Sequence, residues 1–383
     1  MPIEFVGSPR SSLGVEWELE LVDATTRELT SGAPEILRVM GEGREGGHPK
    51  AKPELLRSTV EVITGICQTV AEARADLAAT VAEVVDHAEA QNLRVLCSGT
   101  HPFTDWTTQE ITDEPRYQRL VQDMQWPARQ LQIFGVHVHV GVRSGEKAVA
   151  MVNALCAYLP HLLALSASSP YWLGNDTGLA SSRSKVFEGL PTAGIPYQLS
   201  GWEEFERFMD TLIEAQTIAS IREVWWDVRP HPMFGTVELR MCDGMPRLSE
   251  VMTVAALAQC LVERFNGQLD RGYTLPVPRS WIVRENKWRA ARHGLDTKII
   301  VDDSGAQQPL SEAVLELVDE LLPYAHRLGC AEELTHARTL VAEGPSYRRQ
   351  RAVVAAGGDL RAVVDSLVEE LRTDRAATRR TPA

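Results

Sequence analysis

The sequence lacks the cysteine patterns of a zinc ribbon or a dithiol redox protein. Its 383 residues include only six cysteines, and no two have the Cys-x-x-Cys spacing. Most of them, including Cys156 and Cys260, lie within apolar runs. We therefore expect buried, reduced thiols in a reducing compartment.

Targeting and membrane signals are also missing. The first residues lack the basic start and apolar run of a signal peptide. The longest charge-poor stretch, 148–175, is interrupted by Asn153, Pro160 and His161, which favours a kinked core helix over a membrane span. These absences predict a cytoplasmic protein with no membrane partner.

Positive charge is scarce, and the common nucleotide-binding motifs are absent. With 39 Lys and Arg against 52 Asp and Glu, the formal net charge is −13, and no basic stretch is present to bind nucleic acid. There is no GxxxxGK[ST], GxGxxG, HExxH or GxSxG motif, and the glycine-rich segment 41–48 lacks the lysine and hydroxyl of a phosphate loop. If this protein binds phosphate groups, side chains and metal ions must hold them.

The hydrophobic pattern predicts an α+β domain. Alternation and β-branched residues predict strands at 13–23, 59–64, 93–97, 133–142, 221–228 and 236–242. Helical spacing predicts helices at 70–90, 147–167, 201–215, 249–265, 311–328 and 360–372, the first with Thr69 as its N-cap and Glu72 completing a capping box. Without regular βαβ alternation, this order favours a mostly antiparallel sheet with helices on one side. We expect one domain over 1–373 and a flexible tail at 374–383.

Three carboxylates share one face of the first predicted strand. Glu16, Glu18 and Glu20 are two residues apart, so they point the same way, while the intervening residues are apolar or tryptophan. The row is either a solvated acidic surface or a functional site. Burying like charges side by side requires cations.

Further strands carry isolated polar groups. Glu61 lies in an apolar strand with Glu54 upstream, either as an edge charge facing water or as a paired or metal-bound carboxylate. His137 and His139 share a strand face between glycines, a pattern that favours metal ligation, phosphate contact or proton transfer over plain packing.

The last polar strand combines a carboxylate with a guanidinium. Glu238 and Arg240 lie on one face, as a salt bridge or as a metal ligand beside a phosphate-binding arginine. Other residues of interest are Arg183, Arg229, Asn286, Trp288 and Arg289. Several oxygen ligands together call for a hard cation, and Mg²⁺ keeps substrate phosphates as further ligands. The residues alone thus predict a magnesium–nucleotide site on a sheet face.

At these residues the sequence closely resembles the carboxylate–amine ligases of the glutamate–cysteine ligase type 2 family. The resemblance extends from Leu13 to Asp296. It rests on LGVEWELELVD, VEVITGICQTVAEARADL, GTHPFTDW, ITDEPRYQRL, FGVHVHVGV, YLPHLLALSASSPYWLGNDTGLASSRS, LPTAGIPY, WWDVRPHPMFGTVELRMCD and ENKWRAARHGLD.

The resemblance implies a fold and a ligand set. The fold would be glutamine-synthetase-like, with a curved, mostly antiparallel sheet, helices on its outer side, and ATP and Mg²⁺ (or Mn²⁺) on its concave face. The implied metal ligands are Glu16, Glu18, Glu54, Glu61, His139 and Glu238. The implied catalytic arginines are Arg183, Arg229 and Arg240, and the implied nucleotide contacts are His137, Arg240, Asn286 and Arg289. His137 is able to exchange roles with His139, and Trp17 should affect packing and not metal binding.

The implied reaction activates a carboxylate with ATP as an acyl phosphate, which an amine then converts to an amide. Glutamate and cysteine are one candidate pair, and a different acid and amine are the alternative. A phosphagen-type kinase and a non-catalytic nucleotide-binding protein are further alternatives. Relatives suggest a homodimer, with small-molecule substrates as the other partners.

Overall fold

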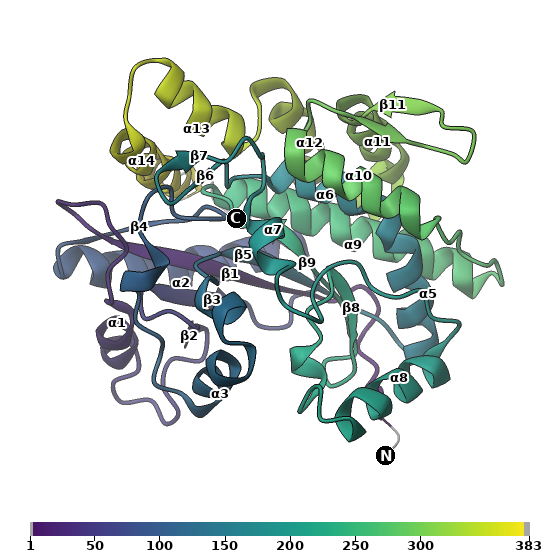
Figure 1. Cartoon of the computed structure of the whole chain (residues 1–383). Coiled ribbons are helices and arrows are strands. Elements are labelled where there is room, and N and C mark those ends of the chain that lie inside the picture. Colours follow the sequence, from purple (N-terminus) through teal and green to yellow (C-terminus); the bar gives the residue numbers. More distant parts are fainter. Residues whose placement is uncertain (1–2, 379–383) are drawn as a thin grey trace.

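The computed structural model describes residues 3–378, which are built around an antiparallel sheet of seven strands (Figure 1). The strands of this sheet are β1 (Leu13–Asp23), β2 (Ala51–Pro53), β3 (Thr59–Ile63), β4 (Leu93–Leu96), β5 (Gly135–Gly141), β8 (Val228–His231) and β9 (Thr236–Asp243). Their order is β2-β3-β1-β5-β9-β8, and β4 also pairs with β1. Two small hairpins join β6 (Tyr171–Trp172) to β7 (Asn175–Asp176) and β10 (Lys298–Ile300) to β11 (Gln307–Pro309).

Helices make up most of the remaining chain. They are α1 (Ala33–Met40), α2 (Val70–Ala90), α3 (Pro115–Met124), α4 (Trp126–Arg129), α5 (Gly145–Leu155), α6 (Leu159–Ser166), α7 (Arg183–Phe187), α8 (Trp202–Glu214), α9 (Leu248–Asp270), α10 (Ser280–His293), α11 (Leu310–Leu328), α12 (Ala331–Glu343), α13 (Ser346–Ala355) and α14 (Leu360–Thr378). Thr69 caps α2 as predicted, since its hydroxyl accepts a hydrogen bond from the Glu72 amide. The Glu72 carboxylate accepts from the Gln68 amide and not from Thr69, so the expected capping box is displaced by one residue.

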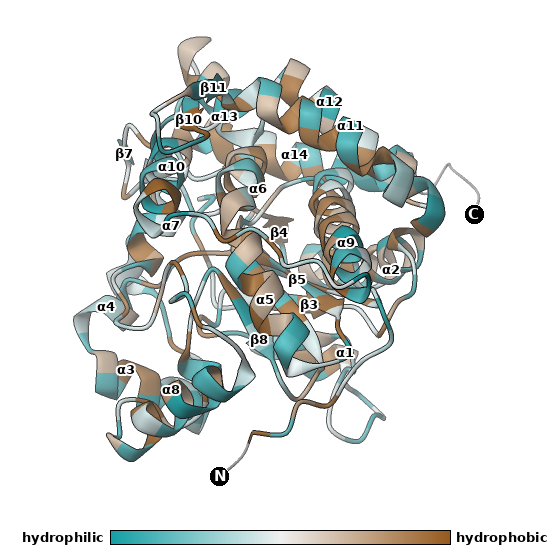
Figure 2. Ribbon diagram, turned by 90° about the vertical axis from the view of Figure 1, so that its right-hand side faces the viewer, coloured by the Kyte–Doolittle hydropathy of each residue, from teal (hydrophilic) through white to brown (hydrophobic). Residues whose placement is uncertain are grey.

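The apolar face of the sheet packs against helices. Along β1, Val15, Trp17, Leu19 and Leu21 are buried in the main hydrophobic core, together with residues of α2, α5, α6 and α9. The Trp17 side chain is fully buried, and its indole nitrogen donates to the Met245 carbonyl, so this tryptophan affects packing as predicted. Figure 2 shows α9 mostly in the colour of hydrophobic residues.

One helical stretch, Gly145–Ser166, is long and apolar enough to cross a membrane, but 83% of its most apolar window is buried inside the protein. A 3₁₀ turn, Cys156–Tyr158, separates its two helices, and Pro160 lies in the first turn of the second. The stretch is therefore the interrupted core element that the sequence predicted.

In Figure 1, α3 and α8 lie below the sheet, whereas α11 and α12 lie above it.

The structure corrects several predicted elements. The strand expected at 221–228 is wrong: residues Ile221–Glu223 form a 3₁₀ turn, and β8 lies within the segment expected to be a loop. Two prolines discouraged a strand there, but β8 is at the edge of the sheet, where proline is tolerated. Helices α10, α12 and α13 were not predicted. Helix α14 continues to Thr378, past its expected end at 372, and 379–383 of the expected tail lie outside the described residues.

Candidate active site

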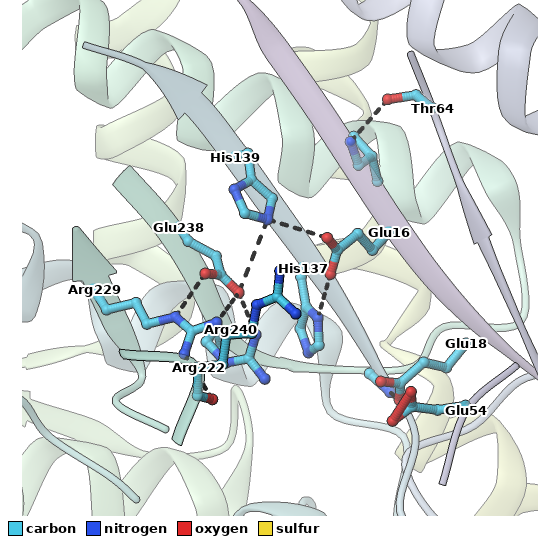
Figure 3. Close-up of polar contacts among 12 residues, drawn as sticks. Glu16, Glu18, Glu54, Thr64, His137, His139, Arg222, Arg229, Glu238 and Arg240 are labelled. Carbon is cyan, nitrogen blue, oxygen red and sulfur yellow. Dashed lines mark hydrogen bonds and ion pairs between the residues drawn. The ribbon is translucent and has the colours of Figure 1, made fainter. Parts of the chain in front are cut away.

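The polar face of the sheet brings together carboxylates, imidazoles and guanidiniums from five strands and one following loop (Figure 3). Strand register creates the arrangement, because residues opposite one another on adjacent strands are close neighbours. The opposed pairs are Glu18 with Glu61, Glu16 with His137, His139 with Glu238, and Arg229 with Glu238. The predicted metal residues therefore form a continuous polar strip across the sheet.

One candidate metal group consists of Glu16, His137 and Glu238, whose ligand atoms lie within 4.8 Å of one another. The Nδ1 atom of His137 is 2.9 Å from Glu16 Oε2. Burial raises the pKa of Glu16, but its contacts with His137 and His139 outweigh burial and hold the pKa below the ordinary value. Burial, reinforced by Arg240, lowers the pKa of His137 to about 4, so this imidazole is neutral and able to bind a cation.

His139 has a different environment from His137. Its Nε2 atom lies 3.2 Å from Glu16 and 3.9 Å from Glu238, while its Nδ1 atom is 3.0 Å from the Thr236 hydroxyl. Burial lowers the pKa of His139, but the two carboxylates outweigh burial and raise it. Both histidines therefore lie beside the carboxylates of the candidate metal group, His137 through Nδ1 and His139 through Nε2.

A second candidate group contains Glu18, Glu61 and His137, also with ligand atoms within 4.8 Å. Glu18 Oε2 accepts a 2.5 Å hydrogen bond from the Gly135 amide, and Glu54 accepts one of 2.8 Å from the Tyr117 hydroxyl. Burial and the charge of Glu54 raise the pKa of Glu18 to about 8. Burial also raises the pKa of Glu61 well above its usual value, and the charges of Glu16, Glu54 and Glu18 add to this effect.

The donor set fits divalent cations. Without a cation, these carboxylates are costly to keep ionised side by side, because their mutual repulsion adds to their desolvation. Oxygen atoms from several glutamates with one imidazole suit Mg²⁺ or Mn²⁺. The buried Nε atoms of Arg183 and Arg240 have no hydrogen-bond partner within the described part of the chain.

Two arginines flank Glu238. Arg229 donates from Nε to Glu238 Oε2 at 2.7 Å, and its Nη1 donates to the Val224 carbonyl at 2.8 Å. Arg240 is paired with the other oxygen of Glu238, and its own amide donates to the Asp227 carbonyl. A register shift between β5 and β9 around His137 sets Arg240 beside that histidine. Arg240 also lines the adjacent cavity, where it can neutralise phosphate charge, whereas the Arg229 guanidinium is held by Glu238 and backbone carbonyls.

Arg183 enters the site from the start of α7. A side chain at Gly135 would collide with it, since an added Cβ would lie 2.2 Å from Arg183 Nη2. Asp243 holds the surrounding loops by accepting hydrogen bonds from the Ser168 amide and from the hydroxyls of Ser169 and Ser181. The space left by the missing side chain of Gly135 is therefore occupied by the protein's own arginine.

A cavity of about 490 Å³ opens beside these groups. Its polar wall includes Glu18, Glu54, His137, Arg183 and Arg240. The remaining wall comes largely from α3, the segment 131–134, and residues near α7 and Trp225. Its volume is typical of small-molecule sites.

Two predicted nucleotide contacts lie elsewhere. Asn286 exchanges two 2.8 Å hydrogen bonds with the backbone of Ile300 in β10, and Arg289 donates to the Lys298 carbonyl. Neither lines the cavity, and both attach α10 to the β10–β11 hairpin. From the same motif, Lys287 is buried against Asp227 and Glu188, so this helix supports the site from behind.

Sequence reasoning missed three residues of the cavity wall. Arg116, Tyr117 and Arg222 line it, and Tyr117 contacts Glu54 directly. The first two lie in the matching stretch ITDEPRYQRL, which was noted without a role for either. The signal that could have identified Arg116 and Tyr117 was their position in a polar helix that begins with a proline.

Comparisons with known proteins identify the family of the chain. The family model described as glutamate–cysteine ligase family 2 (GCS2) matches residues 12–366. A protein of Frankia casuarinae is 60% identical over 377 residues, 98% of this chain and 99% of its own. One of Thermobifida fusca is 54% identical over 374 residues, 97% of this chain and 94% of its own. Their provisional names are glutamate–cysteine ligase 2-1 and 2.

Solved structures show the same fold. The glutamate–cysteine ligase of Francisella tularensis, in complex with AMP, has a TM-score of 0.70 at 14% identity, covering 97% of this chain and 90% of that one. A bifunctional glutathione synthetase from Pasteurella multocida has a TM-score of 0.69 at 16% identity, covering 96% and 52%. The predicted α+β fold with a mostly antiparallel sheet is confirmed, and these two ligases share it.

Proposed function

The chain belongs to glutamate–cysteine ligase family 2 and is an ATP-dependent ligase, and from this premise we propose that it joins a carboxylate to an amine through an acyl phosphate. The observation that carries the proposal is the polar strip of carboxylates, histidines and arginines beside a cavity. Hard cations, phosphate groups and a small acid can all be bound within that one region.

We propose that the strip holds Mg²⁺, with Mn²⁺ as a substitute. Glu16, His137 and Glu238 would hold one ion, and Glu18 with Glu61 would hold another, with Glu54 close by. Bound Mg²⁺ would neutralise phosphate charge and orient the phosphates. His139 lies beside two of these carboxylates and would be a further ligand for the first ion.

The protein's own side chains would position and shield the reaction. In the first step, a substrate carboxylate oxygen attacks the γ-phosphorus of ATP, and ADP leaves. In the second step, the amine attacks the acyl carbon, phosphate leaves and the amine loses a proton. Arg229 and Arg240 would stabilise charge on the transferred group, and Arg183 would bind the acid.

Glutamate and cysteine, the substrates in the relatives' names, are the first pair to test. A different acid and amine remain the alternative. We also propose a cytoplasmic location, supported by the six buried, unbridged cysteines, and a homodimer, which light scattering of the purified protein would test.

The experiment measures phosphate release from Mg–ATP with glutamate plus cysteine and then with panels of acids and amines, while mass spectrometry identifies products. We expect a new amide in amounts that match the phosphate released. A phosphorylated product that accumulates and never reacts with any amine would indicate a kinase instead. ATP binding without turnover across the panels would indicate a binding protein.

A further inference from the structure

Another cavity, of about 540 Å³, is lined by residues of α7, α8 and α10 and by the segment 191–195 (Figure 1). No residue in the described part of the chain lines both this cavity and the one beside the metal-binding strip. The chain at 187–191 separates them, because Phe187 and Leu190 line the first cavity, whereas Glu188 and Pro191 line this one. Its volume is sufficient for a small molecule of its own.

Four aromatic side chains line this cavity. Phe208 and Trp226 are stacked with ring centres 5.2 Å apart, and Tyr197 meets both rings edge-on. The fourth ring, Trp288, has the Lys185 ammonium 5.2 Å from its centre. Tyr197 and Trp288 are 64% and 43% exposed, so aromatic surface remains available to a ligand.

The charged side chains of the wall leave one positive charge without a counter-ion. Glu188 contacts Lys185 at 2.7 Å and Lys287 at 2.6 Å, and Lys287 also contacts Asp227 at 2.6 Å. These two cations and two carboxylates neutralise one another. Arg284 also lines the cavity, and its exposed side chain has no hydrogen bond or ion pair with the described residues. The cavity therefore has one guanidinium free to bind an anion.

We propose that this cavity is a second ligand site, which binds a planar aromatic molecule that carries one carboxylate. The ring contacts Tyr197 and Trp288, and the carboxylate pairs with Arg284, whose guanidinium matches its geometry. A cationic ligand would be repelled by Arg284, and a neutral ring would leave that charge unpaired.

The adenine base of ATP is the competing occupant, because it is also planar and the proposed function requires a site for it. The phosphates of ATP would lie on the metal-binding strip, and the chain at 187–191 stands between the cavity beside that strip and this one. A nucleotide also carries several negative charges, whereas this wall has one uncompensated cation. Both observations favour a separate acid, and the experiment has an arm for the nucleotide.

The test is calorimetric binding of four related probes to the full chain. Indole-3-acetate has the ring and the carboxylate, indole-3-acetamide lacks the charge, tryptamine reverses it, and cyclohexylacetate lacks the aromatic ring. We expect indole-3-acetate to bind at least ~10-fold more tightly than each of the other three. Equal affinity of the acid and its amide, or no binding of the acid, would overturn the proposal.

Two variants with matched controls locate the site. Arg284→Gln and Trp288→Ala should each weaken binding of indole-3-acetate at least ~10-fold. Arg361→Gln changes another exposed arginine, on α14, and Trp281→Ala changes another exposed tryptophan of α10, so both should bind like wild type. Losses in the controls as large as in the paired variants would contradict the assignment to this cavity.

The nucleotide arm repeats the titration with saturating Mg²⁺ and β,γ-methylene-ATP. The acid should bind with the same affinity as before, because the two ligands occupy separate cavities. Displacement of the acid by the nucleotide, with weaker nucleotide binding in Trp288→Ala, would make this cavity the base site and overturn the proposal. Since amide formation is not measured, this result stands whether or not ligation is found.

Discussion

Glu61 is the carboxylate of the strip with the least compensation. It lies opposite Glu18, and burial together with Glu16, Glu54 and Glu18 raises its pKa well above the usual value. We predict that Glu61→Gln lowers Mg-dependent turnover at least ~100-fold, because a metal ligand is lost. In EDTA near neutral pH the same variant should be more stable than wild type in chemical denaturation, because the amide removes the cost of ionising Glu61 in the folded state.

Glu238→Gln provides the comparison for this stability effect. Glu238 pairs with two guanidiniums, so its loss leaves Arg229 and Arg240 buried without their counter-ion. We expect a loss of about 3–5 kcal/mol in chemical denaturation, the opposite sign from Glu61→Gln. Equal destabilisation of the metal-free protein by both variants would contradict the prediction that Glu61 lowers the stability of the fold and that Glu238 raises it.

Arg240 contacts both the metal-binding strip and the cavity. Its side chain pairs with Glu238, and its Nε atom is buried without a hydrogen-bond partner. We predict that Arg240→Ala lowers kcat by roughly 10²–10³, because its contact should strengthen as phosphoryl transfer proceeds. The dissociation constant for Mg–ATP should change far less, which equilibrium binding would measure. An unchanged kcat would remove Arg240 from the catalytic groups.

At the scale of single elements, the sequence predicted what local periodicity determines. Alternation in β1 correctly separated the glutamate face from the Trp17 face, and Thr69 correctly marked the start of α2. Register between strands is set by tertiary packing, so the opposition of Glu16 to His137 was not predictable from either segment alone. For the same reason, the contacts of His139 with both Glu16 and Glu238 emerged only from the assembled sheet.

Gly135 illustrates how one element depends on another. It begins β5, its amide donates to Glu18, and its missing side chain leaves room for Arg183. We predict that Gly135→Ala lowers kcat/KM at least ~10-fold, with most of the effect in KM for the acid, because Arg183 must move. Gly14→Ala is the control, since its Cβ would meet only His139 Cβ at an ordinary 3.6 Å. Equal kinetics for the two variants would show that Arg183 does not bind the acid.

At the scale of the whole molecule, residues distant in sequence complete the site. Arg183 and Tyr117 come from loops and helices whose placement no local pattern determines, and the cavity between them exists only after folding. Asn286 and Arg289 are the opposite case. They lie in a motif that resembles the family, but their helix, α10, supports the site from outside the cavity. The family resemblance indicated which residues could take part in the site, but only the folded structure shows which of them are close to one another.

The C-terminal helices are fixed to the core by a buried ion-pair network. Glu250 on α9 contacts Arg349 on α13 at 2.7 Å, and Arg349 also contacts Glu370 on α14 at 2.6 Å. Arg247 contacts Glu370 at 3.0 Å. Burial raises the pKa of Glu250 to about 7, Glu370 adds to this effect, and Arg349 and Arg247 oppose it.

This pKa makes the stability of the fold depend on pH in a predictable direction. The unfolded carboxyl of Glu250 loses its proton near pH 4.5, whereas the folded one keeps it until about pH 7. The folded state therefore binds more protons in that interval, and stability falls as the pH rises through it. Between pH 5 and 8, urea denaturation should show wild type losing roughly 3 kcal/mol more than Glu250→Gln. Glu312→Gln, which changes an exposed glutamate on α11, should follow wild type. Identical pH slopes in wild type and Glu250→Gln would mean that Arg349 keeps Glu250 ionised throughout, and that the network holds the C-terminal helices as a permanent ion pair.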